Sequence, residues 1–276
     1  MATILDRYGI KEVADVTFYE IDDETGVELP GKPVLYLDTL KVSTIEQTAE
    51  SADARGGKGN AALISWDYGK EITVTLEDAL YSAKSLALMF GDVDANGLPD
   101  PGQGEIKSIK KTLAIANVEK IENGNAVAKI NGADVTLHNS IFYKDGKELE
   151  TKPTTVTGFD FVTGNLGVTA ITIDVSANSF PGTYYVTGDT YARSETTGKD
   201  EFFQFIIPKA KVLSESNTIT LEAEGDPTVF SMSLKVLRPK NGKMMQLVQY
   251  SLTGNAPVEG EEEEQEPVAP EGGENT

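Results

Sequence analysis

The segment FGDVDANGLPDPGQG, residues 90–104, places oxygen-bearing residues at the spacing used by calcium-binding loops. These residues fall at positions 1, 3, 5, 7 and 9 of an EF-hand-like loop, with Gly97 at the sharp turn. The candidate ligands are Asp92, Asp94, Asn96, Leu98 (through its carbonyl) and Asp100. Gln103 stands where an EF-hand has its bidentate acid, so a true EF-hand is not expected. Two interpretations stay open: a weaker structural Ca²⁺ site, as in dockerin or integrin-propeller loops, or a helix-to-strand connection built from turn-forming residues.

The remaining chemistry-bearing residues form no usual catalytic or zinc-binding set. The chain has no cysteine, and its one histidine, His138, lies in the alternating segment VTLHNSIF. A thiol-based dyad and a usual zinc site are therefore excluded. Acidic pairs are plentiful, but none is marked out by its setting, and Trp66 alternates with Ile64 and Tyr68, as in a strand that packs in a core or an interface. We expect no enzymatic activity and no required cofactor.

The net charge of −20 bears on the class of partner. It argues against a protein that grips nucleic acid through phosphates, because such proteins carry clustered lysine and arginine. Residues 255–276 are rich in Glu, Pro and Gly and lack aromatic side chains, so we expect a disordered acidic tail. We also expect no signal peptide and no membrane partner, because no uncharged apolar run approaches the ~20 residues of a membrane span.

The elements that must position these residues are mostly short strands. Segments such as EVADVTFYEI, EITVTL and FFQFIIP alternate apolar with polar residues and are separated by Gly, Asn, Asp and Pro. The fold expected for residues 1–254 is therefore mainly β, an antiparallel sandwich or barrel. One amphipathic helix is expected at about residues 75–90, capped by Thr75 and closed by Gly91, and it should flank the sheet.

A long connection is expected at residues 43–60, between a strand ending near Val42 and one near Leu63. Over most of its length the segment shows neither the helical nor the strand periodicity of apolar residues. Connections of this length without secondary structure are usually functional or disordered. We expect it to be mobile in the monomer and to order against a neighbouring subunit. Its candidate contact residues are Gln47, Glu50, Arg55, Gly56, Gly57, Lys58 and Asn60. The part ARGGKGN lacks the spacing and the following helix of a phosphate-binding loop.

Two long segments together resemble the major tail tube proteins of long-tailed bacteriophages. They are TAESADARGGKGNAALISWDYGKEITVTLEDALYSAKSLALMFG and FPGTYYVTGDTYARSETTGKDEFFQFIIPKAKVLSESNTITLEAEGDPTVFSMSLKVL. The likeness covers about Val34 to Tyr250 and is least evident between residues 92 and 150, where an insertion that decorates the outer surface is possible. The resemblance implies a β-sandwich flanked by a helix, six subunits closed into a ring, and rings stacked through a long loop.

The resemblance also implies a role and partners. The protein would be made in the host bacterial cytoplasm and assembled into the virion tail, as a tube through which the genome passes at ejection. Its partners would be further copies of itself, and possibly tape measure, tail terminator, baseplate and sheath proteins. An acidic body is consistent with DNA that slides without sticking. The alternatives are a capsid decoration or other head structural protein, and a Ca²⁺-dependent carbohydrate-binding module.

Overall fold

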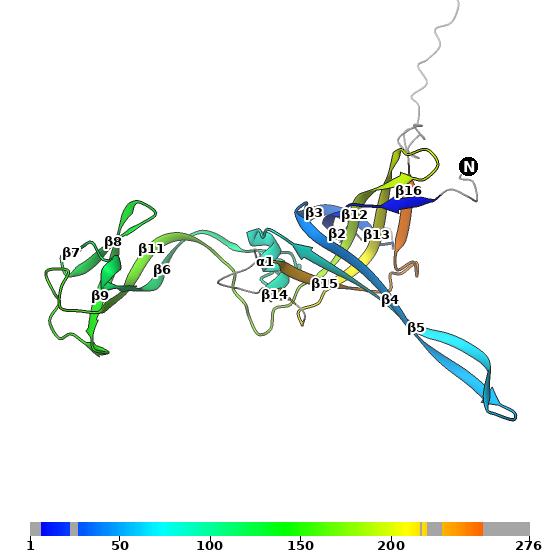
Figure 1. Ribbon diagram of the computed structural model, residues 1–276, viewed down its shortest axis with the longest axis horizontal. Coiled ribbons are helices and arrows are strands. Elements are labelled where there is room, and N and C mark those ends of the chain that lie inside the picture. Colours follow the sequence, from blue (N-terminus) through cyan, green and yellow to red (C-terminus); the bar gives the residue numbers. More distant parts are fainter. Residues whose placement is uncertain (1–6, 23–26, 216, 220–227, 251–276) are drawn as a thin grey trace, which may run out of the picture.

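The structure is a computed structural model that describes residues 7–22, 27–215, 217–219 and 228–250. Within these residues it contains two antiparallel sheets, one α-helix and one short 3₁₀-helix (Figure 1). The expectation of a mainly β, antiparallel fold with one flanking helix is confirmed, and neither sheet closes into a barrel. The acidic tail expected at residues 255–276 lies outside the described residues.

The large sheet has the strand order β3-β2-β12-β13-β15-β5-β4. Its strands are β2 (Asp15–Asp22), β3 (Leu29–Leu37), β4 (Leu40–Gly56), β5 (Ala61–Asp78), β12 (Thr183–Ser194), β13 (Asp200–Val212) and β15 (Phe230–Val236). Three shorter strands pair with it: β1 (Tyr8–Ile10) with β12, β14 (Thr218–Ile219) with β15, and β16 (Gln246–Tyr250) with β13. All of these pairings are antiparallel.

One face of the large sheet is buried, and its other face carries both polar and aromatic side chains. Along β2, Val16 and Phe18 are fully buried, and along β5 the buried apolar residues are Ile72, Val74 and Leu76. Their neighbours at intervening positions, such as Thr73, lie on the opposite face, because side chains alternate along a strand. We call that opposite face the outer face. The strand alternation in the sequence therefore predicted which residues form the core.

The helix α1 (Ala83–Phe90) is shorter than expected and begins later. Ser82 caps it: the Ser85 N–H donates to Ser82 Oγ at 3.0 Å, and the Ser82 N–H donates to Ser85 Oγ at 2.8 Å. Gly91 closes the helix at φ 78°, as expected. The prediction of a helix start at Thr75 was wrong because Leu76 belongs to β5, where it pairs with Met232 of β15 and is buried. Residues 72, 74 and 76 fit a strand period, and the ladder to β15 outweighs the helical pattern.

The small sheet has the order β6-β11-β9-β8-β7 and a core that shares no residue with the large one. Its elements are β6 (Gly102–Ala114), η1 (Ile115–Asn117), β7 (Lys120–Glu122), β8 (Asn125–Ile130), β9 (Ala133–Lys144), β10 (Lys147–Glu148) and β11 (Phe161–Thr172). We call residues 102–172 the distal lobe, since Figure 1 shows them at the far end of the β6–β11 ribbon. The insertion expected at residues 92–150 falls largely within this lobe.

Candidate assembly surface

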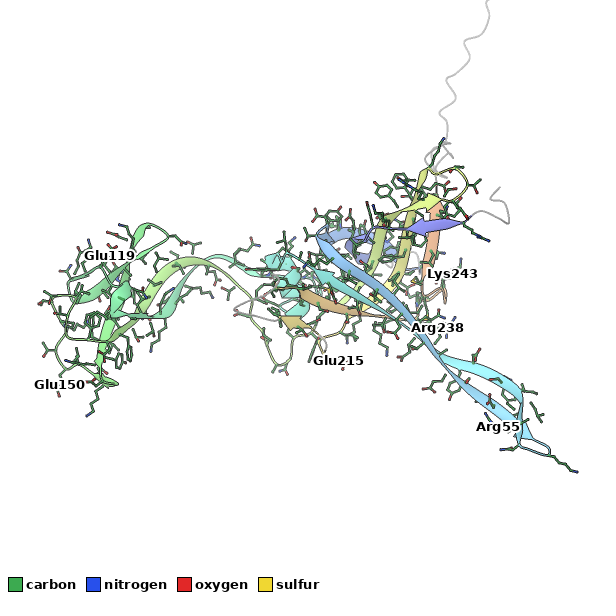
Figure 2. All side chains as sticks on the ribbon, in the orientation of Figure 1. Arg55, Glu119, Glu150, Glu215, Arg238 and Lys243 are labelled. Carbon is green, nitrogen blue, oxygen red and sulfur yellow. The ribbon has the colours of Figure 1, made fainter. Side chains whose placement is uncertain are left out.

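A two-stranded arm projects from the large sheet where an unstructured loop was expected. Strands β4 and β5 remain hydrogen-bonded from the core out to the pair Gly56 and Ala61, so residues 43–60 are strand and tip rather than a long loop. Figures 1 and 2 show this hairpin extending away from the body. We call residues 44–71 the arm. The expectation that the segment lacks structure of its own was wrong.

The reason for this error lies in the exposure of the arm. Nearly all side chains of the arm on both strands are exposed or partly exposed, so neither face carries an alternation of buried and solvated residues. The backbone ladder holds the strands together without that pattern. An isolated two-stranded ribbon is only marginally stable in water, so the arm depends on the sheet from which it grows. Such a ribbon is a surface to which another chain can bind.

A β-bulge at Gly69 changes which face of the ribbon the alternating residues of β5 occupy. Thr48 pairs with Glu71 and Glu50 pairs with Tyr68, so β5 has one residue more than β4 between these pairs. Gly69 adopts φ +64°, which glycine reaches at no steric cost and which is typical of this kind of bulge. Ile72, Val74 and Leu76 of β5 face the core, whereas on the other side of the bulge the even-numbered residues Tyr68, Trp66 and Ile64 lie on the outer face.

The outer face of the arm carries an apolar row that has no cover within the described residues. Ile64, Trp66 and Tyr68 are 55%, 55% and 53% exposed. Their cross-strand partners on the same face are Ala54, Ala52 and Glu50, of which two are small. We call Ile64, Trp66 and Tyr68 the apolar stripe. Sequence reasoning placed Trp66 in a core or an interface, and the structure excludes the core of its own subunit.

The tip of the arm is a glycine-rich turn. Gly57 and Gly59 have positive φ, and Asn60 N–H donates to the Gly57 carbonyl at 3.2 Å. Arg55, labelled in Figure 2, is paired with Asp53 of its own strand at 2.7 Å. Lys58 lies in the turn between the glycines. The positive charge expected from Arg55 is therefore partly neutralised locally.

The seven candidate contact residues of the segment are spread along the arm rather than gathered. Gln47 lies near its base opposite Ile72, Glu50 lies opposite Tyr68, and the remaining five are at the tip. The residues that sequence reasoning left out of this set are the apolar stripe. Their alternation was visible in the sequence, but it was continuous with that of Ile72 and Val74, so nothing in the pattern marked where the strand leaves the core.

The loop at residues 92–100 uses its polar atoms to close a turn. Asp94 Oδ1 accepts hydrogen bonds from the N–H groups of Asn96 (2.8 Å) and Leu98 (2.9 Å). The Leu98 carbonyl accepts from Asp94 N–H, and Asp92 Oδ2 accepts from the N–H of Asp174. The hydrogen bond from Leu98 N–H is the main reason that the pKa of Asp94 lies below its usual value.

The spacing of the acidic and amide residues in this loop is therefore explained by the hydrogen bonds that close the turn. Asp100 N–H donates to the Asp92 carbonyl at 3.0 Å, and Val93 and Pro99 form a bridge, so the loop is a small closed hairpin. Within the described residues, no three His, Cys, Asp or Glu side chains are grouped so that they could hold a metal ion. Calcium binding stays a prediction, which a Ca²⁺ titration of the wild type against Asp94→Ala checks.

A second apolar surface lies where β12, β13 and β16 meet. Tyr191 is opposite Phe202, and Phe202 is opposite Tyr250, so the three rings form one row across three strands. The ring centroids of Phe202 and Tyr250 are 5.3 Å apart and the rings are stacked, and Tyr191 and Phe202 are also 5.3 Å apart. We call these three residues the aromatic platform. It lies on the outer face of the sheet.

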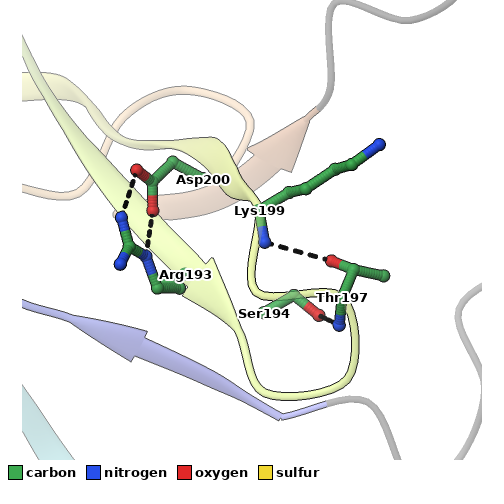
Figure 3. A network of polar contacts seen from close by, with 5 residues as sticks. All are labelled: Arg193, Ser194, Thr197, Lys199 and Asp200. Carbon is green, nitrogen blue, oxygen red and sulfur yellow. Dashed lines mark hydrogen bonds and ion pairs between the residues drawn. The ribbon is translucent and has the colours of Figure 1, made fainter.

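Polar rows border the aromatic platform on both sides. Toward the β12–β13 turn, Arg193 makes a bidentate ion pair with Asp200 at 2.6 and 2.7 Å (Figure 3). This hydrogen bonding from Arg193 holds the pKa of Asp200 below its usual value. On the other side, Gln204 Nε2 donates to Asp189 Oδ1 at 2.7 Å. An apolar centre with a polar rim is the usual anatomy of a protein interface.

The comparison with family models shows to which protein family the chain belongs. The model described as the YomU/Tube protein family matches residues 8–249. The chain belongs to the YomU/Tube protein family. This is a family of phage tube-like proteins. A comparison with curated proteins found no match.

The match to the YomU/Tube protein family spans the arm, the distal lobe and all of the aromatic platform except Tyr250. Both sheets and both exposed apolar surfaces thus lie within the range that the family model covers. None of the helices among the described residues is long and apolar enough to cross a membrane.

Proposed function

We propose that this protein is the structural subunit of a phage tail tube. Copies of the chain close into rings, which we expect to be hexameric, and the rings stack into a tube that passes the genome. The protein is then a component of the virion tail that carries out no catalysis. Membership of the YomU/Tube protein family supports the tube role, and the arm supports the stacking.

The single observation that carries the proposal is the arm with its exposed apolar stripe. Trp66 and Tyr68 are more than half exposed on a ribbon that has no second layer within the described residues. Exposed aromatic rows of this kind mark protein interaction sites, and aromatic residues are enriched in interfaces. In a tube of identical subunits, the nearest surface that can cover the stripe belongs to another copy.

The outer face of the large sheet supports a passage for DNA. On β5 and β15 this face carries Glu71, Thr73, Thr75, Ser233 and Lys235, whose ammonium group pairs with Glu71 at 2.9 Å, and on β12 it carries Asp189. Hydroxyl and carboxylate side chains on a channel wall would not retain phosphates, whereas a basic wall would hold them through counterion release. We expect the part of this face formed by β5 and β15, rather than the aromatic platform, to line the channel.

Electron microscopy of the purified protein tests the proposal. The wild type should form rings or tubes with an open channel in negative stain. In a matched variant, residues 48–71 are removed and Gln47 is joined to Ile72 by an Asn-Gly turn, because these two residues are cross-strand neighbours. That variant should stay folded and soluble but form no tubes.

Two outcomes would contradict parts of this proposal. Tubes of wild-type length from the arm deletion would show that the arm does not stack rings. A wild-type protein that forms neither rings nor tubes at high concentration, and instead decorates capsids, would favour a head structural role over the tube.

A further inference from the structure

The aromatic platform is the strongest candidate for the surface that receives the arm. Its Tyr191 is 50% exposed and its Tyr250 is 38% exposed, and no strand or helix of the described residues covers them. Each subunit therefore exposes two apolar rows, and neither has a partner within the described part of its own chain. We propose that the apolar stripe of one copy packs on the aromatic platform of the next copy, an inference that rests on the tube role.

The two rows match in length and chemistry. The apolar stripe occupies three alternate positions of one strand, which extends over about 13 Å at the usual rise per residue. The aromatic platform crosses three adjacent strands, whose spacing gives about 10 Å plus the width of the rings. Trp66 and Tyr68 on one side and Tyr191 and Phe202 on the other can then form aromatic pairs, which add to the burial of apolar area.

The placement of the two rows favours a head-to-tail contact. In Figure 1 the arm projects toward the lower right, and the end of the sheet formed by β12, β13 and β16 lies at the top. A contact between two different surfaces of identical subunits is heterologous, so it repeats without closing and produces a stack. This is the polarity that a growing tube requires.

Leu80 and Tyr81 form the main rival surface, at 64% and 61% exposure. Tyr81 already packs on Phe230 with ring centroids 4.9 Å apart, so part of its apolar area is used within the subunit. These residues also lie between β5 and α1, on the side from which the ribbon to the distal lobe departs (Figure 1). The rival surface is therefore less suited to an end-to-end contact.

Cross-linking tests the assignment directly, because the chain has no cysteine of its own. Ala52→Cys lies opposite Trp66 on the same face of the arm, and Val248→Cys lies two residues from Tyr250 on the same face of β16. Tubes of the double variant treated with a short bismaleimide should give a ladder of covalent oligomers in denaturing gels. Each single variant should give no ladder beyond a dimer.

The matched control is the double variant Ala52→Cys with Leu80→Cys. If tubes form and only this control gives a ladder, or if neither double variant does, the aromatic platform is not the receptor, although the tube role stands. A ladder from Ala52→Cys with Val248→Cys that appears only after removal of residues 255–276 would also overturn the inference, in favour of the subunit's own C-terminal segment as occupant. Failure of the wild type to form tubes contradicts the proposed function itself.

A mixing experiment tests the polarity. Trp66→Ser removes the centre of the stripe, and Tyr191→Ser removes one ring of the platform. Each variant alone should raise the critical concentration for tube formation by about tenfold or more, as expected for an interface hot spot. Mixed together, the two variants retain one intact arm and one intact platform per pair, so pairs of stacked rings should form and stop. Unchanged tube assembly by Tyr191→Ser would refute the assignment.

Discussion

Tyr184 connects the turn at residues 92–100 to the start of β12. Its side chain is 1% exposed, its hydroxyl donates to the Gly97 carbonyl, and the Gly182 N–H donates to it at 3.3 Å. Its ring meets Phe18 edge-on with centroids 6.0 Å apart. Burial raises the pKa of Tyr184 to about 12, because the phenolate would lose its hydration.

This shift predicts a loss of stability at high pH. The unfolded chain releases the tyrosine proton near pH 10, whereas the folded chain keeps it to about pH 12. The contribution is therefore complete below pH 10 and is lost as the pH rises to 12, by about 2 to 3 kcal/mol in the free energy of unfolding. Urea unfolding of the wild type and of Tyr184→Phe should show a difference in stability that shrinks over this range. The pKa values of Tyr36 and Tyr185 are also raised, so these two residues contribute to the pH dependence of both proteins. A stability difference between wild type and Tyr184→Phe that stays constant with pH would therefore contradict the assignment to Tyr184.

Gly188 leaves room for an aromatic ring across the sheet. It lies opposite Phe205, and a Cβ at this position would stand 2.1 Å from the ring. Gly188→Ala should therefore lower the free energy of unfolding by about 1 to 3 kcal/mol, because the ring must leave its place in a packed core. Gly167→Ala is the control, since a Cβ there meets nothing within 4 Å. Thermal unfolding compares the two, and equal melting temperatures for both variants would contradict the prediction.

At the scale of the element, the bulge in β5 decides which way the apolar stripe faces. Insertion of one residue after Ala49 in β4 would restore one-to-one pairing across the bulge, and the arm residues beyond it, including the apolar stripe, would then move to the other face of the ribbon. We expect a folded subunit with an intact large sheet and no tubes, seen as a monomer in sedimentation and as an empty field in negative stain.

Gly69→Asn is the control for that insertion, because it changes the bulge residue without changing the number of residues in either strand. Asparagine tolerates the positive φ of this position, and the only neighbour of a Cβ there is Glu50 Cγ at 3.9 Å. The bulge and the tubes should therefore be retained. Tubes from the insertion variant, or none from Gly69→Asn despite normal folding, would show that the orientation of the stripe does not govern assembly.

The same element shows how far the sequence predicts this fold. The alternation of Ile72 and Val74 predicted a strand with one buried face, which is correct, whereas Leu76 continues this strand although a helix was expected there. The apolar stripe alternates in the same way as Ile72 and Val74. Its residues are exposed only because β5 extends beyond the edge of the sheet at that point, which the sequence does not show. In the arm, strand β4 has no alternation of apolar and polar residues, because both of its faces are exposed to solvent. The sequence pattern could therefore not reveal this strand, which is held only by its backbone hydrogen bonds to β5.

At the scale of the whole molecule, the distal lobe is built as a removable unit. Gly102 and Thr172 are paired, so the lobe begins and ends at neighbouring points, and its core around Leu137 and Phe142 is its own. Its eight lysines balance its eight acidic residues, so the net charge of −20 lies entirely on the rest of the chain. In the proposed tube, we expect the neutral lobe to lie outside and the acidic body to surround the DNA.

Excision of the lobe should therefore spare the fold and the tube. We expect that joining Pro101 to Ile173 by a short Gly-Ser linker leaves a soluble protein that forms thinner tubes, because the paired residues at the cut, Gly102 and Thr172, lie only about 5 Å apart. Circular dichroism and the tube diameter in negative stain measure the two effects. A variant that folds but forms no rings would show that the lobe contributes to the contact between subunits.

The continuity of β5 has a mechanical consequence. The strand runs without interruption by a loop from the tip of the arm to Asp78 in the sheet, where residues 73–78 are hydrogen-bonded to β15 along their length. A pull on the arm acts along the axis of β5. The hydrogen bonds between β5 and β15 are perpendicular to this axis, so they are loaded together in shear rather than broken one after another. In the proposed tube, tension between rings would thus be carried along a single strand into the core of each subunit, and we expect the contact between side chains of neighbouring copies to yield before the subunit unfolds.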